Sequence, residues 1–469
     1  MTQVRKFSAL LIVALSLAIS ARAQTAVRSQ TSDVGSQNQR SSRETSEDRS
    51  QTAETGSRIP GTSRETSDTK APKSGNGLLR EPPTPKSCED KTGAPINMLV
   101  LGDSILWGQG IDEKQKISYQ VQDWLCTQTK RPVTIWREAH SGAVLEDGEP
   151  ALTSECPAPP KQADEDDKKK KPDTICGFKG KECGGEVNVD DPTINTQLKN
   201  AINHYGGNGA AVDLVLMDGC INDFGVVRYL LNANYSPPCV KERAKAVCHD
   251  RMRRFLEKAL PLLPNARFIV TGYYPVITEQ SARNVLLRLI LGGFIAKGKQ
   301  KWLFPNAKKN LYQKLKENSE AFGKQTNESL QLSVDEVNAA SGNRISFVPV
   351  YVPPGGSFGQ DGSGFAAHKD TSLLWTTRFN STGLGGLEKF FYVIFRLGFH
   401  ALQPNDQVYA ARKLMCKDAE ATGFAKLSCR VAAFGHPNTK GRDEYVARVN
   451  AALQRVMGEG WMTSEGRKQ

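Results

Sequence analysis

Short apolar runs alternate with amphipathic helical patterns in this 469-residue chain, and this alternation restricts its fold most strongly. The runs that predict strands are residues 96–101, 133–136, 212–217, 267–271 and 345–350. The patterns that predict helices are residues 118–126, 192–204, 243–263, 325–340 and 442–457. Strands that alternate with helices usually form a parallel sheet with helices on both faces. The sequence therefore predicts an α/β fold.

The N-terminal residues 1–23 have the pattern of a secretory signal peptide. Arg5 and Lys6 precede an apolar stretch at 7–19, and a small-x-small cleavage site ends at Ala23. The apolar stretch is short for a membrane span. We therefore expect cleavage after Ala23 and a secreted or periplasmic protein, with an uncleaved anchor as the alternative.

Residues 24–87 are rich in Ser, Thr and charged side chains, and 24–86 contain no aromatic residue. Such a segment buries too little apolar surface to offset its ordering entropy, so we predict a disordered linker. It accounts for the low hydrophobic content of the chain, 38%. The remaining residues, 88–469, are predicted to form the folded domain, with insertions at about 146–190, 281–320 and 351–400.

Ten cysteines in an exported chain predict disulfides. The pairing stays open, although closeness in sequence favours Cys239–Cys248 and Cys416–Cys429. We expect Cys156, Cys176 and Cys183 to hold the insertion at 146–190. Zinc is the alternative use of clustered cysteines, but paired C-x-x-C elements are missing. We therefore expect no metal and no cofactor.

The formal net charge of +12 is a modest excess for a chain with 24% charged residues. Without a basic stripe interleaved with aromatic residues, it indicates a solvated surface and no nucleic-acid partner. The oligomeric state is left open.

Ser104 occupies the position where open α/β sheets place their active sites. The strand predicted at 96–101 ends at Gly102-Asp103-Ser104, and a helical pattern follows. Backbone N–H groups at a helix N-terminus suit a developing oxyanion. The alternative is that these three residues only form a turn and a helix cap.

A serine hydroxyl needs a base before it is a good nucleophile, and neutral imidazole is suited to that task. His436 precedes the last predicted helix, and His400 is the alternative base. The backbone N–H of Gly142 and the side-chain amide of Asn222 follow predicted strands and are candidate oxyanion donors. Each of these two residues alone could simply be a turn residue.

Together these residues resemble the four blocks of the SGNH hydrolase superfamily, also called the GDSL esterase/lipase family. Gly102-Asp103-Ser104, Ser141-Gly142-Ala143, Gly219-Cys220-Ile221-Asn222-Asp223 and His436-Pro437 follow one another in the family order. The third block carries one extra residue between Gly219 and Asn222. The resemblance implies a three-layer α/β/α sandwich and a Ser104 nucleophile with a His436 base. It also implies an oxyanion hole formed by Ser104, Gly142 and Asn222.

One position departs from the family pattern. Ala433 stands three residues before His436, where the family usually has an Asp that orients the imidazole. A backbone carbonyl, or an Asp from elsewhere such as Asp406 or Asp418, are the open alternatives. Some members of the family that the chain resembles work as a Ser-His dyad, and loss of activity is a further alternative.

The resulting hypothesis is an exported serine esterase or lipase that hydrolyses carboxylic esters through an acyl-enzyme. One alternative is a polysaccharide O-deacetylase of the same fold. Another is a non-catalytic cell-surface or carbohydrate-binding module. Apolar runs at 281–304 and 384–399 are expected to be core helices, or else a mobile cover that contacts lipid surfaces and favours longer acyl chains.

Overall fold

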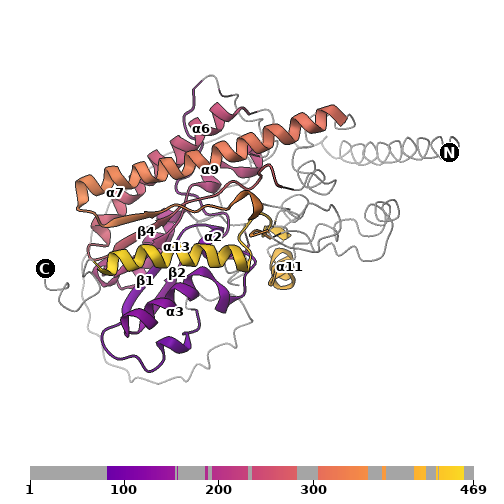
Figure 1. Cartoon of the computed structure of the whole chain (residues 1–469). Coiled ribbons are helices and arrows are strands. Elements are labelled where there is room, and N and C mark those ends of the chain that lie inside the picture. The colour runs from indigo at the N-terminus through magenta and orange to yellow at the C-terminus, as the bar shows by residue number, and fades with distance from the viewer. Residues whose placement is uncertain are drawn as a thin grey trace, which may run out of the picture. The chain divides into compact units, whose positions relative to one another are not determined.

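The structure is a computed structural model (Figure 1). It describes residues 82–153, 156, 185–187, 193–230, 235–281, 305–356, 372–375, 406–418, 429–430 and 432–458. Several predictions fall outside these residues: the signal peptide, nearly all of the linker, most of the insertion at 146–190, both apolar runs and His400.

A five-stranded parallel sheet forms the centre of the described part. Its strands are β1 (Ile96–Leu101), β2 (Val133–Arg137), β3 (Leu214–Met217), β4 (Arg267–Thr271) and β5 (Ile345–Val348), in the order β2-β1-β3-β4-β5. In register, Leu99 of β1 pairs with Trp136 on one side and Val215 on the other. Every side chain of β3 is buried, which explains its uninterrupted apolar sequence. The predicted α/β fold is confirmed.

The strand order reverses at β1, because the chain passes from β2 back across β1 to form β3. Crevices at such a reversal, beyond the carboxyl ends of the strands, are the usual ligand sites of open α/β sheets. The residues that follow β1 and β3 therefore lie at the place where a site is expected.

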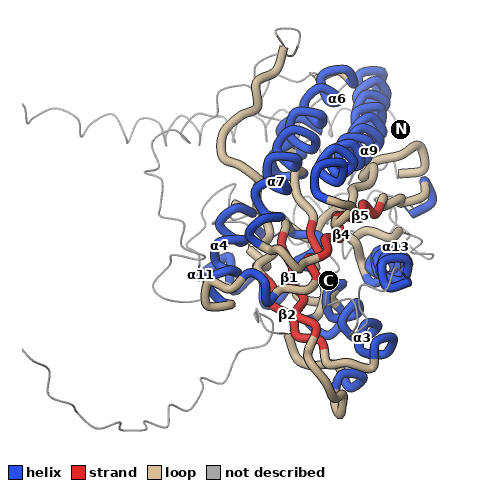
Figure 2. The backbone as a smooth tube through the Cα atoms, turned by 90° about the vertical axis from the view of Figure 1, so that its left-hand side faces the viewer, coloured by secondary structure: helices blue, strands red, loops and turns tan. Residues whose placement is uncertain are grey.

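Helices cover both faces of the sheet. The tube view shows α3 and α13 on one face and α4 and α7 on the other, so the predicted three-layer arrangement is confirmed (Figure 2). The helices and single helical turns are η1 (Lys86–Cys88), α2 (Ser104–Trp107), η2 (Glu113–Gln115), α3 (Ile117–Thr129), α4 (Ile194–His204), η3 (Gly209–Ala211), α5 (Ile221–Phe224), η4 (Val226–Leu230), α6 (Pro237–Lys245), η5 (Ala246–Arg251), α7 (Met252–Leu262), α9 (Pro305–Ser341), η6 (Pro354–Gly356), α11 (Tyr409–Asp418) and α13 (Thr439–Gly458).

Two helices differ most from their predicted extent. The stretch expected as one helix at 243–263 begins earlier and contains a π-helical segment, η5, between α6 and α7. The helix expected at 325–340 begins at Pro305 instead. The N-terminal half of α9 is mostly polar, so the hydrophobic pattern does not reveal it as a helix. Packing of α9 against α6 stabilises the longer helix.

Four disulfides link the described residues: Cys88–Cys126, Cys156–Cys239, Cys220–Cys248 and Cys416–Cys429. The predicted Cys416–Cys429 bond is confirmed, and the predicted Cys239–Cys248 bond is wrong. Both residues of the wrong pair lie in one continuous helical stretch, where the rise along the axis separates them by about 13 Å. A disulfide needs a much shorter separation. Cys156 joins α6, whereas Cys176 and Cys183 lie outside the described residues.

None of the helices described is both long enough and apolar enough to span a bilayer. Disulfides in this number are typical of proteins that fold in an oxidising compartment.

Candidate active site

Ser104 lies at the N-terminus of α2, directly after β1. Gly102 takes a φ of +132°, and a Cβ there would overlap the Asp218 carboxylate, so only glycine fits this turn. The side chain of Gln197 on α4 pairs with both backbone groups of Gly102, at 2.8 Å each. Asp103 is the N-cap of α2 and accepts a hydrogen bond from Ile105 N. These contacts fix the backbone that carries Ser104.

His436 lies in a loop that precedes α13, and neighbouring segments hold that loop in place. Trp375 N donates to His436 O at 2.8 Å, and the Tyr274 hydroxyl donates to Gly435 O at 2.8 Å. Asn438 caps α13 by accepting from the backbone N–H groups of Lys440 and Gly441.

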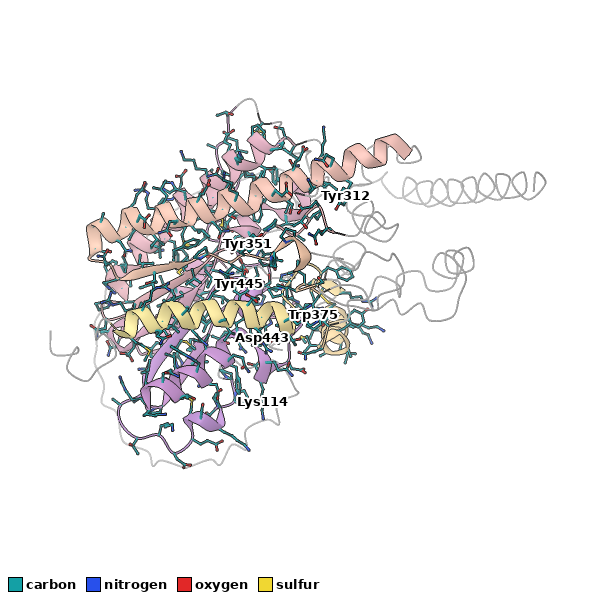
Figure 3. The ribbon with its side chains drawn as sticks, in the orientation of Figure 1. Lys114, Tyr312, Tyr351, Trp375, Asp443 and Tyr445 are labelled. Carbon is teal, nitrogen blue, oxygen red and sulfur yellow. A yellow bond between two sulfur atoms is a disulfide. The ribbon has the colours of Figure 1, made fainter. Side chains whose placement is uncertain are left out.

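Helix α13 is itself fixed to the carboxyl end of β4. The Tyr445 hydroxyl donates to Gly272 O, just after β4, at 3.1 Å. Figure 3 labels Tyr445 on α13 and Trp375 near the N-terminal end of the same helix. With the loop and the helix held, His436 Nε2 lies 2.6 Å from Ser104 Oγ. The structure therefore brings together the predicted nucleophile and the predicted base.

The other ring nitrogen of His436 faces backbone rather than a carboxylate. Nδ1 is buried and has no hydrogen-bond partner of good geometry among the described residues, while the carbonyls of residues 432–434 raise the pKa of the imidazole. Ala433 is buried and apolar. Asp406 accepts from Arg412 Nη2 at 2.5 Å, and the side chain of Asp418 lies outside the described part. Backbone carbonyls thus stand where the family pattern has an Asp.

The imidazole is neutral at pH 7. Removal from water lowers the pKa of His436 from 6.5 to about 4, and the Arg412 guanidinium contributes in the same direction. A neutral imidazole hydrogen-bonded to a hydroxyl can accept its proton, which is the arrangement that general-base activation of a serine requires.

Donors for an oxyanion lie around the same turn. Within the described part, the N–H groups of Ser104 and Gly142 make no hydrogen bond. Asn222 Nδ2 donates one hydrogen to Ala143 O at 2.9 Å, which leaves its second hydrogen for another acceptor. His140 N donates to Gly102 O at 3.0 Å, so the loop that carries Gly142 is tied to the turn that carries Ser104.

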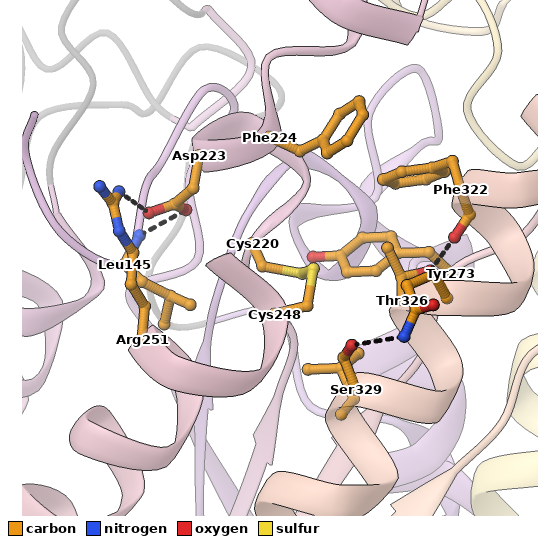
Figure 4. The surroundings of a disulfide bond; sticks show 12 residues. Leu145, Cys220, Asp223, Phe224, Cys248, Arg251, Tyr273, Phe322, Thr326 and Ser329 are labelled. Atoms are coloured by element: carbon orange, nitrogen blue, oxygen red, sulfur yellow. Dashed lines mark hydrogen bonds and ion pairs between the residues drawn. A yellow bond between two sulfur atoms is a disulfide. The ribbon is translucent and has the colours of Figure 1, made fainter. Parts of the chain in front are cut away.

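A buried carboxylate, that of Asp223, joins the Gly142 loop to α5, which carries Asn222. Asp223 accepts from Leu145 N at 2.8 Å, and its Oδ1 lies 2.7 Å from Arg251 Nη1 (Figure 4). It also accepts from Glu146 N at 3.2 Å. Burial raises the pKa of Asp223, and the N–H donors and Arg251 oppose that rise. The segments that carry Gly142 and Asn222 are therefore anchored to one carboxylate.

Cys220 lies in the segment from Gly219 to Asn222, which has one residue more than the Gly-x-Asn-Asp block. It has a φ of +109°, a left-handed conformation that side chains other than glycine rarely adopt. Its disulfide to Cys248 ties this turn to η5. Neither the left-handed conformation of Cys220 nor its disulfide partner has a signal in the sequence.

Among the described residues, no group of His, Cys, Asp or Glu is arranged so that it could hold a metal ion.

No family model matches this chain, and no curated protein matches it. Several solved structures do. An extracellular lipase from Streptomyces rimosus shares 11% identity, with 76% of this chain and 99% of that one covered and a TM-score of 0.34. A phospholipase A1 from Streptomyces albidoflavus shares 13%, covering 76% and 100%, with a TM-score of 0.35. A family 3 carbohydrate esterase from Clostridium thermocellum shares 14%, covering 54% and 78%, with a TM-score of 0.24. Identities and TM-scores this low do not support any inference about a shared activity.

Proposed function

We propose that this protein is an exported serine hydrolase that cleaves carboxylic esters, with Ser104 as the nucleophile and His436 as the base. The observation that carries the proposal is the 2.6 Å contact between Ser104 Oγ and His436 Nε2 at the carboxyl edge of the sheet. A serine and a neutral imidazole in this geometry are the parts that acyl transfer needs.

In the first half-reaction, Ser104 Oγ attacks the ester carbonyl while its proton passes to His436 Nε2. The carbonyl oxygen becomes an oxyanion, which would be bound by the N–H groups of Ser104 and Gly142 and by the amide of Asn222. The tetrahedral intermediate then collapses. The C–O bond to the alcohol breaks, His436 returns the proton to the leaving oxygen, and an acyl-enzyme remains.

In the second half-reaction, a water molecule replaces the alcohol. His436 takes one proton from the water, the hydroxide attacks the acyl carbonyl, and the same donors would bind the second oxyanion. Collapse breaks the bond to Ser104 Oγ, which regains its proton from His436, and the acid is released. No cofactor takes part in this scheme.

Labelling with a fluorophosphonate probe tests the proposal. The purified protein should be labelled, and the Ser104→Ala variant should not. As a control for general serine reactivity, Ser87→Ala should still be labelled, because the Ser87 hydroxyl donates to Asp123 Oδ1 at 2.6 Å and not to an imidazole. A protein that is inert towards both the probe and a panel of esters would instead support the alternative of a non-catalytic binding module.

A series of p-nitrophenyl esters from acetate to palmitate separates the substrate classes. The esterase or lipase proposal expects turnover of medium or long acyl chains. Activity confined to acetate, together with acetate release from an acetylated polysaccharide, would favour the deacetylase alternative. Vesicles of anionic phospholipid, added to the same assay, test for contact with lipid surfaces.

Export is tested separately. N-terminal sequencing of the mature protein recovered outside the cytoplasm should begin at Gln24, the residue after the expected cleavage site. A mature chain that begins at Met1 would favour the uncleaved anchor.

A further inference from the structure

Carboxylates occupy most of the backbone N–H groups in the turn that carries Ser104. Asp103 N donates to Asp218 Oδ1 at 2.7 Å, and Leu106 N donates to Asp218 Oδ2 at 3.2 Å. Ile105 N donates to Asp103 Oδ1 at 2.9 Å. Of the four successive N–H groups from residue 103 to 106, that of Ser104 is left without an acceptor in the described part.

Asp218 reaches this turn from the neighbouring strand. It is the residue after β3, its side chain is 0% exposed, and β3 pairs directly with β1. A side chain at Gly102 would overlap its carboxylate, so the glycine is what allows the two segments to approach. The carboxylate thus acts as a bridge between the end of β3 and both sides of Ser104.

The buried carboxylate of Asp218 interacts with a second buried carboxylate, that of Asp103. Asp103, also 0% exposed, accepts from the Tyr273 hydroxyl at 2.5 Å. Burial raises the pKa of Asp103 from 3.8 to about 6, and burial together with the Asp103 charge raises the pKa of Asp218 well above its usual value. Both pKa shifts are in the direction that reduces the negative charge beside a forming oxyanion.

We propose that Asp218 is a positioning residue that holds the Ser104 turn so that, of its four N–H groups, that of Ser104 alone is left for the oxyanion. This inference rests on the proposed function, because it assigns Asp218 a task in the reaction of Ser104. It adds a residue outside the nucleophile, base and donor set. The bridge lies between two strands that are distant in sequence, and only the packed sheet brings it about.

Asp213 is a matched control at the opposite end of β3. Its Oδ2 accepts from Asn97 N, near the start of β1, at 2.9 Å. Both carboxylates therefore link β3 to the backbone of the β1 segment, one at each end of the two strands. Removal of either one should destabilise the fold, but only Asp218 is adjacent to Ser104.

The experiment compares Asp218→Ala and Asp218→Asn with Asp213→Ala in the full chain. It measures kcat and KM for a p-nitrophenyl ester that the wild type hydrolyses, the second-order rate of fluorophosphonate inactivation, and the thermal unfolding midpoint. We expect Asp218→Ala to lower kcat and the inactivation rate by about tenfold to a hundredfold, with KM within about twofold. We expect Asp213→Ala to leave kcat within about twofold of wild type.

Asp218→Asn is the conservative variant. The amide has the same shape but keeps one acceptor oxygen, so it can satisfy one of the two N–H groups. Its kcat should fall between those of wild type and Asp218→Ala. This variant decides the test if Asp218→Ala does not fold: a folded Asp218→Asn protein with a lowered kcat supports the inference, and one with the wild-type kcat overturns it.

The outcomes separate the two proposals. An active wild type, with Asp218→Ala and Asp213→Ala equal in kcat, overturns the positioning role and leaves the proposed function intact. A fall in kcat with a rise in KM in all three variants, in proportion to the loss of stability, overturns the positioning role as well. A wild type that neither hydrolyses esters nor reacts with the probe overturns the proposed function, and the positioning role with it.

Discussion

Ser104 and His436 are 332 residues apart in sequence, yet Ser104 Oγ and His436 Nε2 are separated by 2.6 Å. Two different kinds of structure produce this contact. Ser104 is placed by the end of a buried strand and a helix cap, whereas His436 is placed by the backbone of Trp375 and by the hydroxyl of Tyr274. The base therefore depends on loop contacts far more than the nucleophile does.

Replacement of the base is the first prediction. His436→Ala should lower kcat by roughly three orders of magnitude or more, because Ser104 would lose its proton acceptor. Ester hydrolysis and fluorophosphonate labelling measure the effect. His204→Ala is a control within the described part, since that ring stacks on Trp136. His400→Ala should also have much less effect than His436→Ala, and the reverse order would reassign the base.

The second prediction concerns acid pH. A base must be unprotonated to accept the serine proton, and the pKa of His436 is lowered to about 4. We therefore expect kcat/KM to rise with pH through about 4 and to be level from there to neutral pH. Initial rates between pH 3 and 8 give the midpoint, and incubation at pH 4 followed by assay at pH 7 shows whether the protein stays folded. A midpoint near the ordinary imidazole value would contradict the prediction.

The third prediction concerns the left-handed residue beside Asn222. Loss of the Cys220–Cys248 disulfide should cost about 2–4 kcal/mol of stability. The variant Cys220→Gly/Cys248→Ala should keep more kcat than Cys220→Ala/Cys248→Ala. The reason is that glycine adopts a φ of +109° without strain, whereas alanine favours a shift of the turn that carries Asn222.

The Cys416→Ala/Cys429→Ala variant is the control for this third prediction, because that disulfide links α11 to a neighbouring segment. Stability is measured by chemical denaturation and turnover by ester hydrolysis. Equal kcat values in the glycine and alanine variants would argue against a role of the Cys220 backbone in positioning Asn222.

The fourth prediction concerns the buried ion pair between Asp223 and Arg251. Arg251→Met should lower the free energy of unfolding by about 3 kcal/mol or more, because it leaves a buried carboxylate without its partner. Arg253→Met removes two partly exposed ion pairs, to Glu257 and Glu336, from the helix that follows, α7, and should cost less than about 1 kcal/mol. Urea denaturation compares the two variants, and similar costs would show that the Asp223 pair does not anchor the Gly142 loop.

Local sequence signals predicted the sheet well. Strands β1 and β4 begin and end where the apolar runs do, because a strand buried on both faces must be apolar at nearly every position. The predictions failed where packing decides the outcome. The polar N-terminal half of α9 and the π-helical segment η5 have no clear period in sequence. The Cys239–Cys248 pairing failed because closeness in sequence is a poor guide inside a continuous helix.

The sequence by itself determined which residues can do chemistry here: a serine after a buried strand, a histidine before the last helix, and glycine and asparagine after other strands. Hydrophobic period and turn chemistry are local properties, so one chain is enough to find them. Only the tertiary structure decided which groups meet. That Nδ1 of His436 faces backbone carbonyls, and that Asp218 takes the N–H groups on both sides of Ser104, depends on contacts between distant segments. Such contacts form only when the sheet packs, and no local pattern encodes them.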